Sequence, residues 1–223
     1  MADPSFRYGV LISGGGSNLQ ALIDRSADGY IPGRIAVVIS NEPRALGVQR
    51  AVSAGIATRV IDHREFPDRA AFEKAMADTL DAAQVELVCL AGFMRVLTPW
   101  FVRRYQGRLL NIHPALLPAF PGLHVQEKAL TSGVRFSGAT VHFVTEEIDT
   151  GPIVAQAVVP ILPGDDVPTL ASRILRQEHR LYPLAVRLFA QKRLLLHGRQ
   201  VVVADHAVDP DAALINPPLE PIA

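Results

Sequence analysis

The chain is short of cysteine, of net charge and of long apolar runs, and each shortage excludes a class of protein. Only one of the 223 residues is a cysteine, so no disulfide can form within the chain. Basic and acidic residues both number 22, which leaves no cationic excess to attract nucleic acid or an anionic membrane surface. No apolar run approaches the length of a membrane span, and the N-terminus lacks the order of a secretory signal. We therefore expect a cytoplasmic protein whose partners are small molecules, with no nucleic acid and no membrane among them.

What the chain does have is enough apolar residues for a large core, since 49% of the sequence is hydrophobic. We expect one domain over residues 1–204, with no clean linker inside it. Residues 205–223 carry four prolines and four acidic residues, and they are expected to form a loosely ordered tail. The single cysteine, Cys89, lies in the apolar run 85–90 and is interpreted as a buried strand residue rather than a catalytic thiol.

Apolar, β-branched runs alternate with longer helical patterns through the first half of the chain. This order predicts an α/β fold with a Rossmann-like, mostly parallel sheet and crossover helices, which becomes mixed in the C-terminal half. Ligands of such sheets bind beyond the carboxyl ends of the strands, so polar residues that follow strands should converge on one rim. Strands are expected over residues 8–12, 35–39, 58–61, 87–90, 108–112, 139–144 and 153–159, helices over 19–27, 69–83 and 167–189, and a hairpin over 194–203 turned at 197–198.

A glycine-rich loop with the sequence Ser-Gly-Gly-Gly-Ser-Asn-Leu (residues 13–19) joins the first expected strand to a helix. Glycines let the backbone approach a ligand closely, and free amides at a helix N-terminus attract an anion. The loop lacks the Lys-Ser/Thr ending of a nucleoside-triphosphatase loop, and Leu19 replaces the third glycine of a dinucleotide fingerprint. It therefore favours a phosphate monoester held by Gly16, Ser17 and Asn18. The alternative is a tight turn in which Ser17 or Asn18 only caps the helix.

An amide, an imidazole and a carboxylate form the main catalytic candidates. Asn111 and His113 are one residue apart at the end of an expected strand, so extended backbone would point their side chains the same way. If Asp149 lies beside His113, its charge favours the imidazolium, and it can also accept a proton. The alternatives are a histidine satisfied by a backbone partner and a turn aspartate that only bonds nearby amides. His124 and His142 are supporting candidates, and strand alternation lets His142 face either the pocket or the exposed side.

Residues 92–97, Gly-Phe-Met-Arg-Val-Leu, follow the fourth expected strand. Apolar side chains beside exposed backbone at a strand end could receive a flat heterocycle through apolar contact and main-chain hydrogen bonds. The alternative is loop packing beneath the aromatic residues that follow. Thr98 and Pro99 are expected to be the N-cap and the first residue of the next helix.

Further segments extend these motifs: Leu-Ala-Gly-Phe-Met-Arg at 90–95, Asn-Ile-His-Pro-Ala-Leu-Leu-Pro at 111–118, Phe-Pro-Gly-Leu-His at 120–124, and Val-His-Phe-Val-Thr-Glu-Glu-Ile-Asp-Thr-Gly-Pro-Ile at 141–153. Together with the glycine-rich loop, they resemble the folate-dependent phosphoribosylglycinamide formyltransferases. The matches occur in order between residues 10 and 196, which is nearly the whole chain outside the tail.

The resemblance implies the formyltransferase fold and formyl transfer from 10-formyltetrahydrofolate to the amine of 5-phosphoribosylglycinamide in purine biosynthesis. It implies no metal. The co-substrate is the reduced folate, and the protein would be a monomer or a homodimer. By position, the resemblance assigns catalysis to Asn111, His113 and Asp149, substrate phosphate and ribose binding to Gly16, Ser17, Asn18 and Glu178, and folate binding to Arg69, Met94, Arg95, Val96, Leu97, Asn111, Glu146, Glu147 and Ile148.

Three positions depart from the family pattern. Gly15 stands where some relatives have asparagine, and Ala115 and Ala119 stand where some have serine and lysine. Side chains near the phosphate or the active-site loop are thereby missing, which bears on substrate affinity and leaves the catalytic positions intact.

Other functions fit part of the same pattern. A formyltetrahydrofolate hydrolase shares the amide, imidazole and carboxylate but is expected to carry an additional N-terminal domain, whereas the first strand here begins near residue 7. A methionyl-tRNA formyltransferase is expected to have a C-terminal RNA-binding domain and a basic surface, whereas this chain ends in an acidic tail. A non-catalytic sensor of a phosphoribosyl ligand would have no need for an oxyanion donor paired with a carboxylate.

Overall fold

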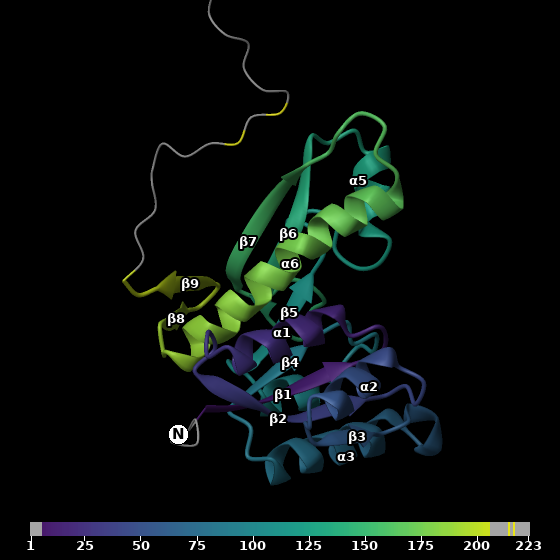
Figure 1. Cartoon of the computed structure of the whole chain (residues 1–223), viewed down its shortest axis with the longest axis vertical. Coiled ribbons are helices and arrows are strands. Elements are labelled where there is room, and N and C mark those ends of the chain that lie inside the picture. Colours follow the sequence, from purple (N-terminus) through teal and green to yellow (C-terminus); the bar gives the residue numbers. More distant parts are fainter. Residues whose placement is uncertain (1–5, 206–213, 215, 217–223) are drawn as a thin grey trace, which may run out of the picture.

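The computed structural model describes residues 6–205, 214 and 216, which fold around a seven-stranded sheet (Figure 1). The strands of this sheet are β1 (Phe6–Ile12), β2 (Gly33–Ser40), β3 (Thr58–Val60), β4 (Leu87–Leu90), β5 (Leu109–His113), β6 (Phe136–Phe143) and β7 (Ile153–Pro160). Their order is β3-β2-β1-β4-β5-β6-β7, with β1 to β5 parallel, β6 antiparallel to β5, and β7 antiparallel to β6. The expected α/β fold with a mixed C-terminal half is confirmed.

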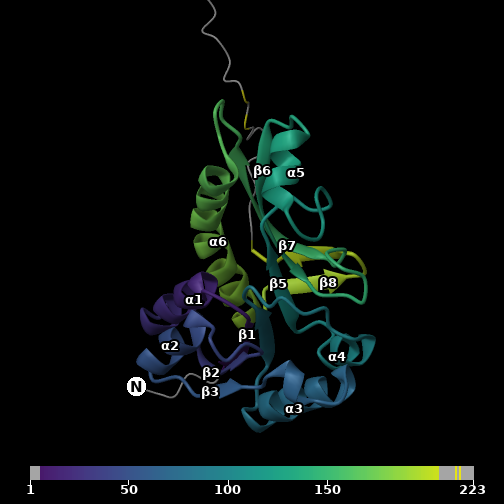
Figure 2. The same ribbon diagram turned by 90° about the vertical axis from the view of Figure 1, so that its right-hand side faces the viewer.

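Helices cover both faces of the sheet (Figure 2). They are α1 (Ser17–Ala27), α2 (Leu46–Ser53), η1 (a 3-10 turn, His63–Glu65), α3 (Arg69–Ala82), α4 (Pro99–Arg104), α5 (Val125–Thr131) and α6 (Val167–Ala190). On one face, α1, α2 and α6 share a buried cluster with the sheet that includes Leu22 and Ile174. On the other, α3 and α4 share a cluster that includes Phe72 and Phe101. Burial of apolar side chains on both faces explains the nearly unbroken apolar runs of the central strands.

The long helix α6 is fixed across the middle of the sheet by a buried tyrosine. The hydroxyl of Tyr182 lies 3.1 Å from the carbonyl oxygens of both Leu90 and Leu110, which belong to β4 and β5. Glu178 lies one helical turn before Tyr182, so this anchor also sets the position of Glu178 relative to the carboxyl ends of the strands. No helix among residues 6–205 is both long enough and apolar enough to cross a membrane.

Most expected elements lie where the sequence pattern predicts them, with ends that differ by up to three residues. The hairpin is formed by β8 (Leu194–His197) and β9 (Gln200–Val203), so its turn is at Gly198 and Arg199 rather than at residues 197–198 as expected. The expected tail at 205–223 lies outside the described residues, apart from Asp205, Leu214 and Asn216. The division into one domain and a tail stays a prediction.

Cys89 is fully buried in β4, as expected, and burial raises the pKa of its thiol to about 12. At neutral pH the thiol is therefore protonated and out of reach of reagents. We expect no reaction of the native protein with an aromatic disulfide reagent, and one equivalent of released thiolate after unfolding in guanidinium chloride. Rapid labelling of the folded protein would contradict the buried assignment.

Candidate functional site

The segments that follow β1, β2 and β4 meet at one rim of the sheet, as predicted. The hydroxyl of Ser13 lies 2.5 Å from Oδ1 of Asn41, and it accepts a hydrogen bond of 2.8 Å from the backbone amide of Met94. The amide nitrogen of Asn41 lies 3.3 Å from Nδ1 of His63. One serine hydroxyl thus joins the glycine-rich loop to the segment that was expected to receive a heterocycle.

The glycine-rich loop leads into α1 with a backbone conformation that favours glycine. Gly16 is the N-cap residue and has φ 69°, and a Cβ atom placed there would lie 2.6 Å from Cα of Gly47 in α2. No side chain caps the helix, so the alternative in which Ser17 or Asn18 is a capping residue is wrong. The amides of the first helical turn have no partners within the helix and are available to an anion.

Asn18 and Glu178 are 160 positions apart in the sequence and meet in the fold. The amide of Asn18 donates a hydrogen bond of 2.6 Å to Oε2 of Glu178, and both side chains are buried. Burial raises the pKa of Glu178, an effect that the bond from Asn18 opposes. Among the residues that the structure describes, Oδ1 of Asn18 has no hydrogen-bond partner. A buried acceptor beside an anion-binding loop suits a ligand hydroxyl.

The three catalytic candidates lie together at the junction of β5 and β6. Asn111 and His113 both belong to β5, and alternation along a strand places them on the same face. The carboxylate of Asp149 lies between two imidazoles, 3.4 Å from Nδ1 of His113 and 3.6 Å from Nε2 of His142. The expected contact between Asp149 and His113 is confirmed.

Asp149 is held by its backbone as well as by its side chain. Its φ of 56° is left-handed, and the amide of Gly122 donates a hydrogen bond of 2.9 Å to Oδ2. Burial alone would raise the pKa of Asp149, but the hydrogen bond from the Gly122 amide and the charge of His113 oppose it, and the pKa lies below the usual value. The carboxylate is therefore ionised at neutral pH.

Both ring nitrogens of His113 face hydrogen-bond acceptors. Nε2 lies 2.9 Å from the carbonyl oxygen of Phe120, and Nδ1 faces Asp149. Because neither oxygen has a proton to donate, the ring satisfies both contacts only when each nitrogen carries a proton. Phe120 has φ 56°, a left-handed conformation that is strained for a bulky side chain.

His142 is buried and lies directly opposite Asn111 in the antiparallel pairing of β5 and β6, which settles the alternative left open by strand alternation. Its Nδ1 lies 2.9 Å from the carbonyl of Phe143, and its Nε2 lies 3.2 Å from the amide nitrogen of Asn111. An Nδ1–H therefore leaves Nε2 free to accept a hydrogen bond from Asn111. The amide has two hydrogens, so this contact orients it and leaves one N–H for a ligand.

The segment expected to flank the folate lies on the surface of the rim. Met94 is 66% exposed and Val96 54% exposed, whereas Leu97 is buried and Arg95 half-buried. Two large apolar side chains at the end of β4 are thus available to a ligand. The segment ends at Thr98, which caps α4 as expected and bonds the buried carboxylate of Glu73 through its amide and its hydroxyl.

The loop around Asp149 carries the other residues expected at the folate. Glu146 forms an ion pair of 2.7 Å with Arg103 of α4, and Glu147 and Ile148 are exposed. A groove of about 520 Å³ borders this loop, the residues around Pro118 and the hairpin. Arg69 is the exposed first residue of α3. Within the described chain, no hydrogen bond or ion pair joins Arg69 to this loop.

His124 is not brought to the catalytic candidates. Its side chain is 76% exposed, and its nearest acidic partner is Glu127 of α5 at 3.9 Å. Its supporting role stays a prediction, since within the described residues no hydrogen bond or ion pair joins its side chain to Asn111, His113 or Asp149. Of the three departures from the family pattern, Ala115 is buried, Ala119 is exposed, and a Cβ atom at Gly15 would meet no atom within 4 Å.

Sequence reasoning missed the groups that hold the site in place. The carbonyl of Phe120 and the amide of Gly122 are backbone groups, so their hydrogen bonds cannot be predicted from the type of residue at those positions. Arg199 of the hairpin donates to the carbonyl of Thr150, which directly follows Asp149. Arg50 of α2 donates to the carbonyl of Gly15. Helix α2 itself was not expected from the sequence.

Comparison with known proteins shows extensive similarity. Residues 6–186 match a family model described as formyl transferase. The chain is 47% identical over 188 residues to phosphoribosylglycinamide formyltransferase of Escherichia coli K12, which covers 84% of this chain and 89% of that protein. It is 53% identical over 196 residues to the trifunctional purine biosynthetic protein adenosine-3 of Drosophila pseudoobscura pseudoobscura, covering 87% of this chain. The chain spans only 14% of the length of that trifunctional protein.

Solved structures give the same result. The crystal structure of glycinamide ribonucleotide transformylase 1 from Symbiobacterium toebii matches with a TM-score of 0.88 and 52% identity, covering 90% of this chain and 94% of that one. The crystal structure of formyltetrahydrofolate deformylase from Burkholderia mallei matches with a TM-score of 0.81 and 30% identity, covering 91% of this chain and 70% of that one. Sequence identity is thus clearly higher to the transformylase than to the deformylase.

Proposed function

The chain belongs to the phosphoribosylglycinamide formyltransferases of the formyl transferase family, and we propose that Asn111, His113 and Asp149 carry out its reaction. The reaction transfers a formyl group from 10-formyltetrahydrofolate to the amine of 5-phosphoribosylglycinamide, a step of purine biosynthesis. The contact of the Asp149 carboxylate with His113, whose neighbour on the same strand face is Asn111, is the observation that carries the proposal.

Asn111 and His113 stabilise the negative charge that develops on the formyl oxygen as the glycyl amine adds to the formyl carbon. The free N–H of Asn111 and a ring N–H of His113 are the two donors. A preorganised donor of this kind contributes about 3 kcal/mol to the transition state. The Nε2–H of His113 is bonded to Phe120, so the carbonyl of Phe120 has to yield to the formyl oxygen during catalysis.

Asp149 has two tasks in this mechanism. As an ionised group in contact with Nδ1 of His113, it accepts a hydrogen bond from that nitrogen and orients the imidazole. It also accepts the proton that the amine loses after attack, directly or through water, and this proton is passed on to the folate nitrogen as the bond between that nitrogen and the formyl carbon breaks. A carboxylate with a lowered pKa is a weak base, but the attacking amine becomes strongly acidic as its bond to carbon forms.

The substrate phosphate binds at the amides of Gly16, Ser17 and Asn18, and the ribose binds beside Glu178. The free amides at the start of α1 and the left-handed N-cap support the phosphate position. The bond between Asn18 and Glu178, with the unpartnered Oδ1 of Asn18 next to it, supports the ribose position. The folate lies along Met94 and Val96, whose exposed side chains offer apolar contact.

An acceptor experiment tests the function. Purified protein with 10-formyltetrahydrofolate should release tetrahydrofolate when phosphoribosylglycinamide is supplied, and the rate with water alone should be negligible. The change in folate absorbance follows both reactions. Equal turnover with water would identify a hydrolase instead. This alternative is included because the fold is also similar to that of a formyltetrahydrofolate deformylase.

Blocking the phosphate-binding loop should affect only one substrate. We expect Gly16→Val, whose side chain would collide with Gly47, to raise the KM for phosphoribosylglycinamide about tenfold or more, with the KM for the folate nearly unchanged. Gly15→Val is the matched control, since a side chain there meets open space and should have a much smaller effect. Equal losses for both substrates would count against the assignment of the loop.

The remaining sequence-based expectations are proposals of the same kind. They are the cytoplasmic location, the assembly as a monomer or homodimer, and the absence of a metal from the reaction. The other activities of the trifunctional relatives are not extended to this chain, which spans a small part of their length.

A further inference from the structure

We propose that Arg50, on helix α2, is a positioning residue that holds the phosphate-binding loop in its binding conformation. The inference rests on the proposed function, because it presumes that the substrate phosphate binds at Gly16, Ser17 and Asn18. Arg50 is neither a ligand of the phosphate nor part of the catalytic group in this proposal. It acts through the backbone of the loop.

Helix α2 contacts the back of the loop at two positions one turn apart. The backbone amide of Gly47 donates a hydrogen bond of 3.0 Å to the carbonyl of Gly14, and Nε of Arg50 donates one of 2.9 Å to the carbonyl of Gly15. Gly47 has no side chain, and a Cβ atom there would lie 2.6 Å from Cδ1 of Ile12. The close approach of the two backbones brings Arg50 within reach of the loop.

These two bonds fix the direction of the loop amides. In a trans peptide the carbonyl and the amide of the next residue point in opposite directions. When the carbonyls of Gly14 and Gly15 turn toward α2, the amides of Gly15 and Gly16 must turn away from it. The bond from Arg50 therefore preorganises the Gly16 amide, which would otherwise rotate freely in a run of three glycines.

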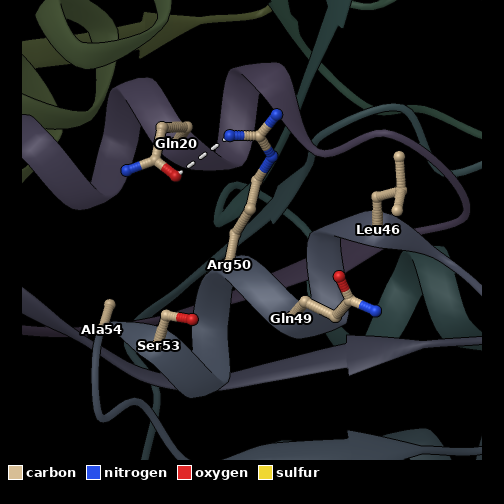
Figure 3. Close-up of a pocket in the computed structure, with 6 residues that line it drawn as sticks. All are labelled: Gln20, Leu46, Gln49, Arg50, Ser53 and Ala54. Atoms are coloured by element: carbon tan, nitrogen blue, oxygen red, sulfur yellow. Dashed lines mark hydrogen bonds between the residues drawn. The ribbon is translucent and has the colours of Figure 1, made fainter.

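The charge of Arg50 is not neutralised. Its guanidinium extends from α2 toward α1, where it donates to Oε1 of Gln20 at 3.3 Å (Figure 3). Among residues 6–205 it forms no ion pair with a carboxylate. A pocket of about 440 Å³ lies beside it, lined by Leu46, Gln49 and Ser53 among others. Because the guanidinium is exposed, solvent and salt weaken its attraction to distant charges.

The field of Arg50 nevertheless reaches helix α6. Burial lowers the pKa of His179, and the charge of Arg50 lowers it further, against the opposing charge of Asp24. His179 follows Glu178, the residue that bonds Asn18 of the loop. Arg50 thus combines a directed bond to the loop with a positive charge that is felt at α6, although it lies on the side of the loop opposite the amides that would bind the phosphate. The guanidinium supplies both the bond and the charge, whereas a lysine would keep the charge and lack the Nε–H that bonds Gly15.

Kinetics with two substrates and three variants test the inference. We expect Arg50→Met to raise the KM for phosphoribosylglycinamide about tenfold, with kcat and the KM for the folate within about twofold of the wild type. Arg50→Lys, which keeps the charge and loses the Nε bond, should show most of the same loss. Arg44→Met, which removes an exposed charge just before α2, should match the wild type.

The dephosphorylated substrate, glycinamide riboside, provides a readout that a merely structural role would not move. The wild type should prefer the phosphorylated substrate strongly, and Arg50→Met should lose about tenfold of that preference. An unchanged preference in Arg50→Met, or parallel losses in kcat and in both KM values, would overturn the role of Arg50. A wild type that does not distinguish the two substrates would instead overturn the phosphate-binding loop, and with it the premise.

Discussion

Replacing Asp149 with asparagine is expected to lower kcat by about 100-fold or more while both substrates still bind. Asparagine has nearly the same size, tolerates the left-handed φ of 56°, and can still accept the hydrogen bond from the Gly122 amide. It removes the charge that contacts both His113 and His142. The change therefore separates the electrostatic role of Asp149 from its role in the turn.

Steady-state kinetics, with a thermal melt of each protein, measure this effect. Asp78→Asn is the matched control, since Asp78 is an exposed carboxylate on α3 that pairs with Lys74 far from the site. A turn aspartate without a chemical role would tolerate asparagine, so near-normal kcat in Asp149→Asn would refute the mechanism.

The lowered pKa of Asp149 also predicts a pH dependence. The usual pKa of an aspartate, 3.8, applies to the unfolded chain, and the folded value lies below it. The stabilisation from the ionised carboxylate is therefore fully present above pH 3.8 and is lost as the pH falls through the folded value. Any loss of activity between pH 8 and pH 5 must come from another group, such as a histidine or the substrate amine.

Local patterns predicted the parts of the site that depend on a single element. Asn111 and His113 share a face because β5 stays extended through His113, and period-two alternation follows from that geometry alone. The convergence of Ser13, Asn41 and Met94 follows from parallel strands, whose carboxyl ends lie on one edge of a sheet.

Contacts between distant segments could not be predicted from local patterns. Nothing in the residues around Asp149 or Glu178 shows which strand or loop they face, and the resemblance to a family supplied those assignments. Neither a local pattern nor the resemblance to a family pointed to Arg50, because its partner is a backbone carbonyl in another segment. The position of His124 depends on the turn at residues 120–124, where Phe120 and His124 both have left-handed backbone, and that turn leaves the imidazole exposed.

Replacing Asn111 with leucine is expected to lower kcat by about 100- to 1000-fold, since one oxyanion donor is lost and the size of the side chain is kept. In the proposed mechanism, the amide N–H that Asn111 does not share with His142 binds the charge that develops during the reaction. Loss of such an interaction lowers kcat and kcat/KM equally and leaves KM nearly unchanged.

The competing explanation is that Asn111 only satisfies the buried imidazole of His142. In that case Asn111→Leu would deprive Nε2 of His142 of the hydrogen bond from Asn111, lower the melting temperature and change kcat little. Measuring kcat, both KM values and the thermal midpoint of the same protein separates the two explanations. A variant that is destabilised but turns over within about threefold of the wild type would remove Asn111 from the oxyanion site. A stable variant with a 100-fold lower kcat and normal KM values would show that the Asn111 amide binds the transition state. Normal KM values mean that substrate binding is intact, so the lost interaction must be one that forms only as the substrate reacts.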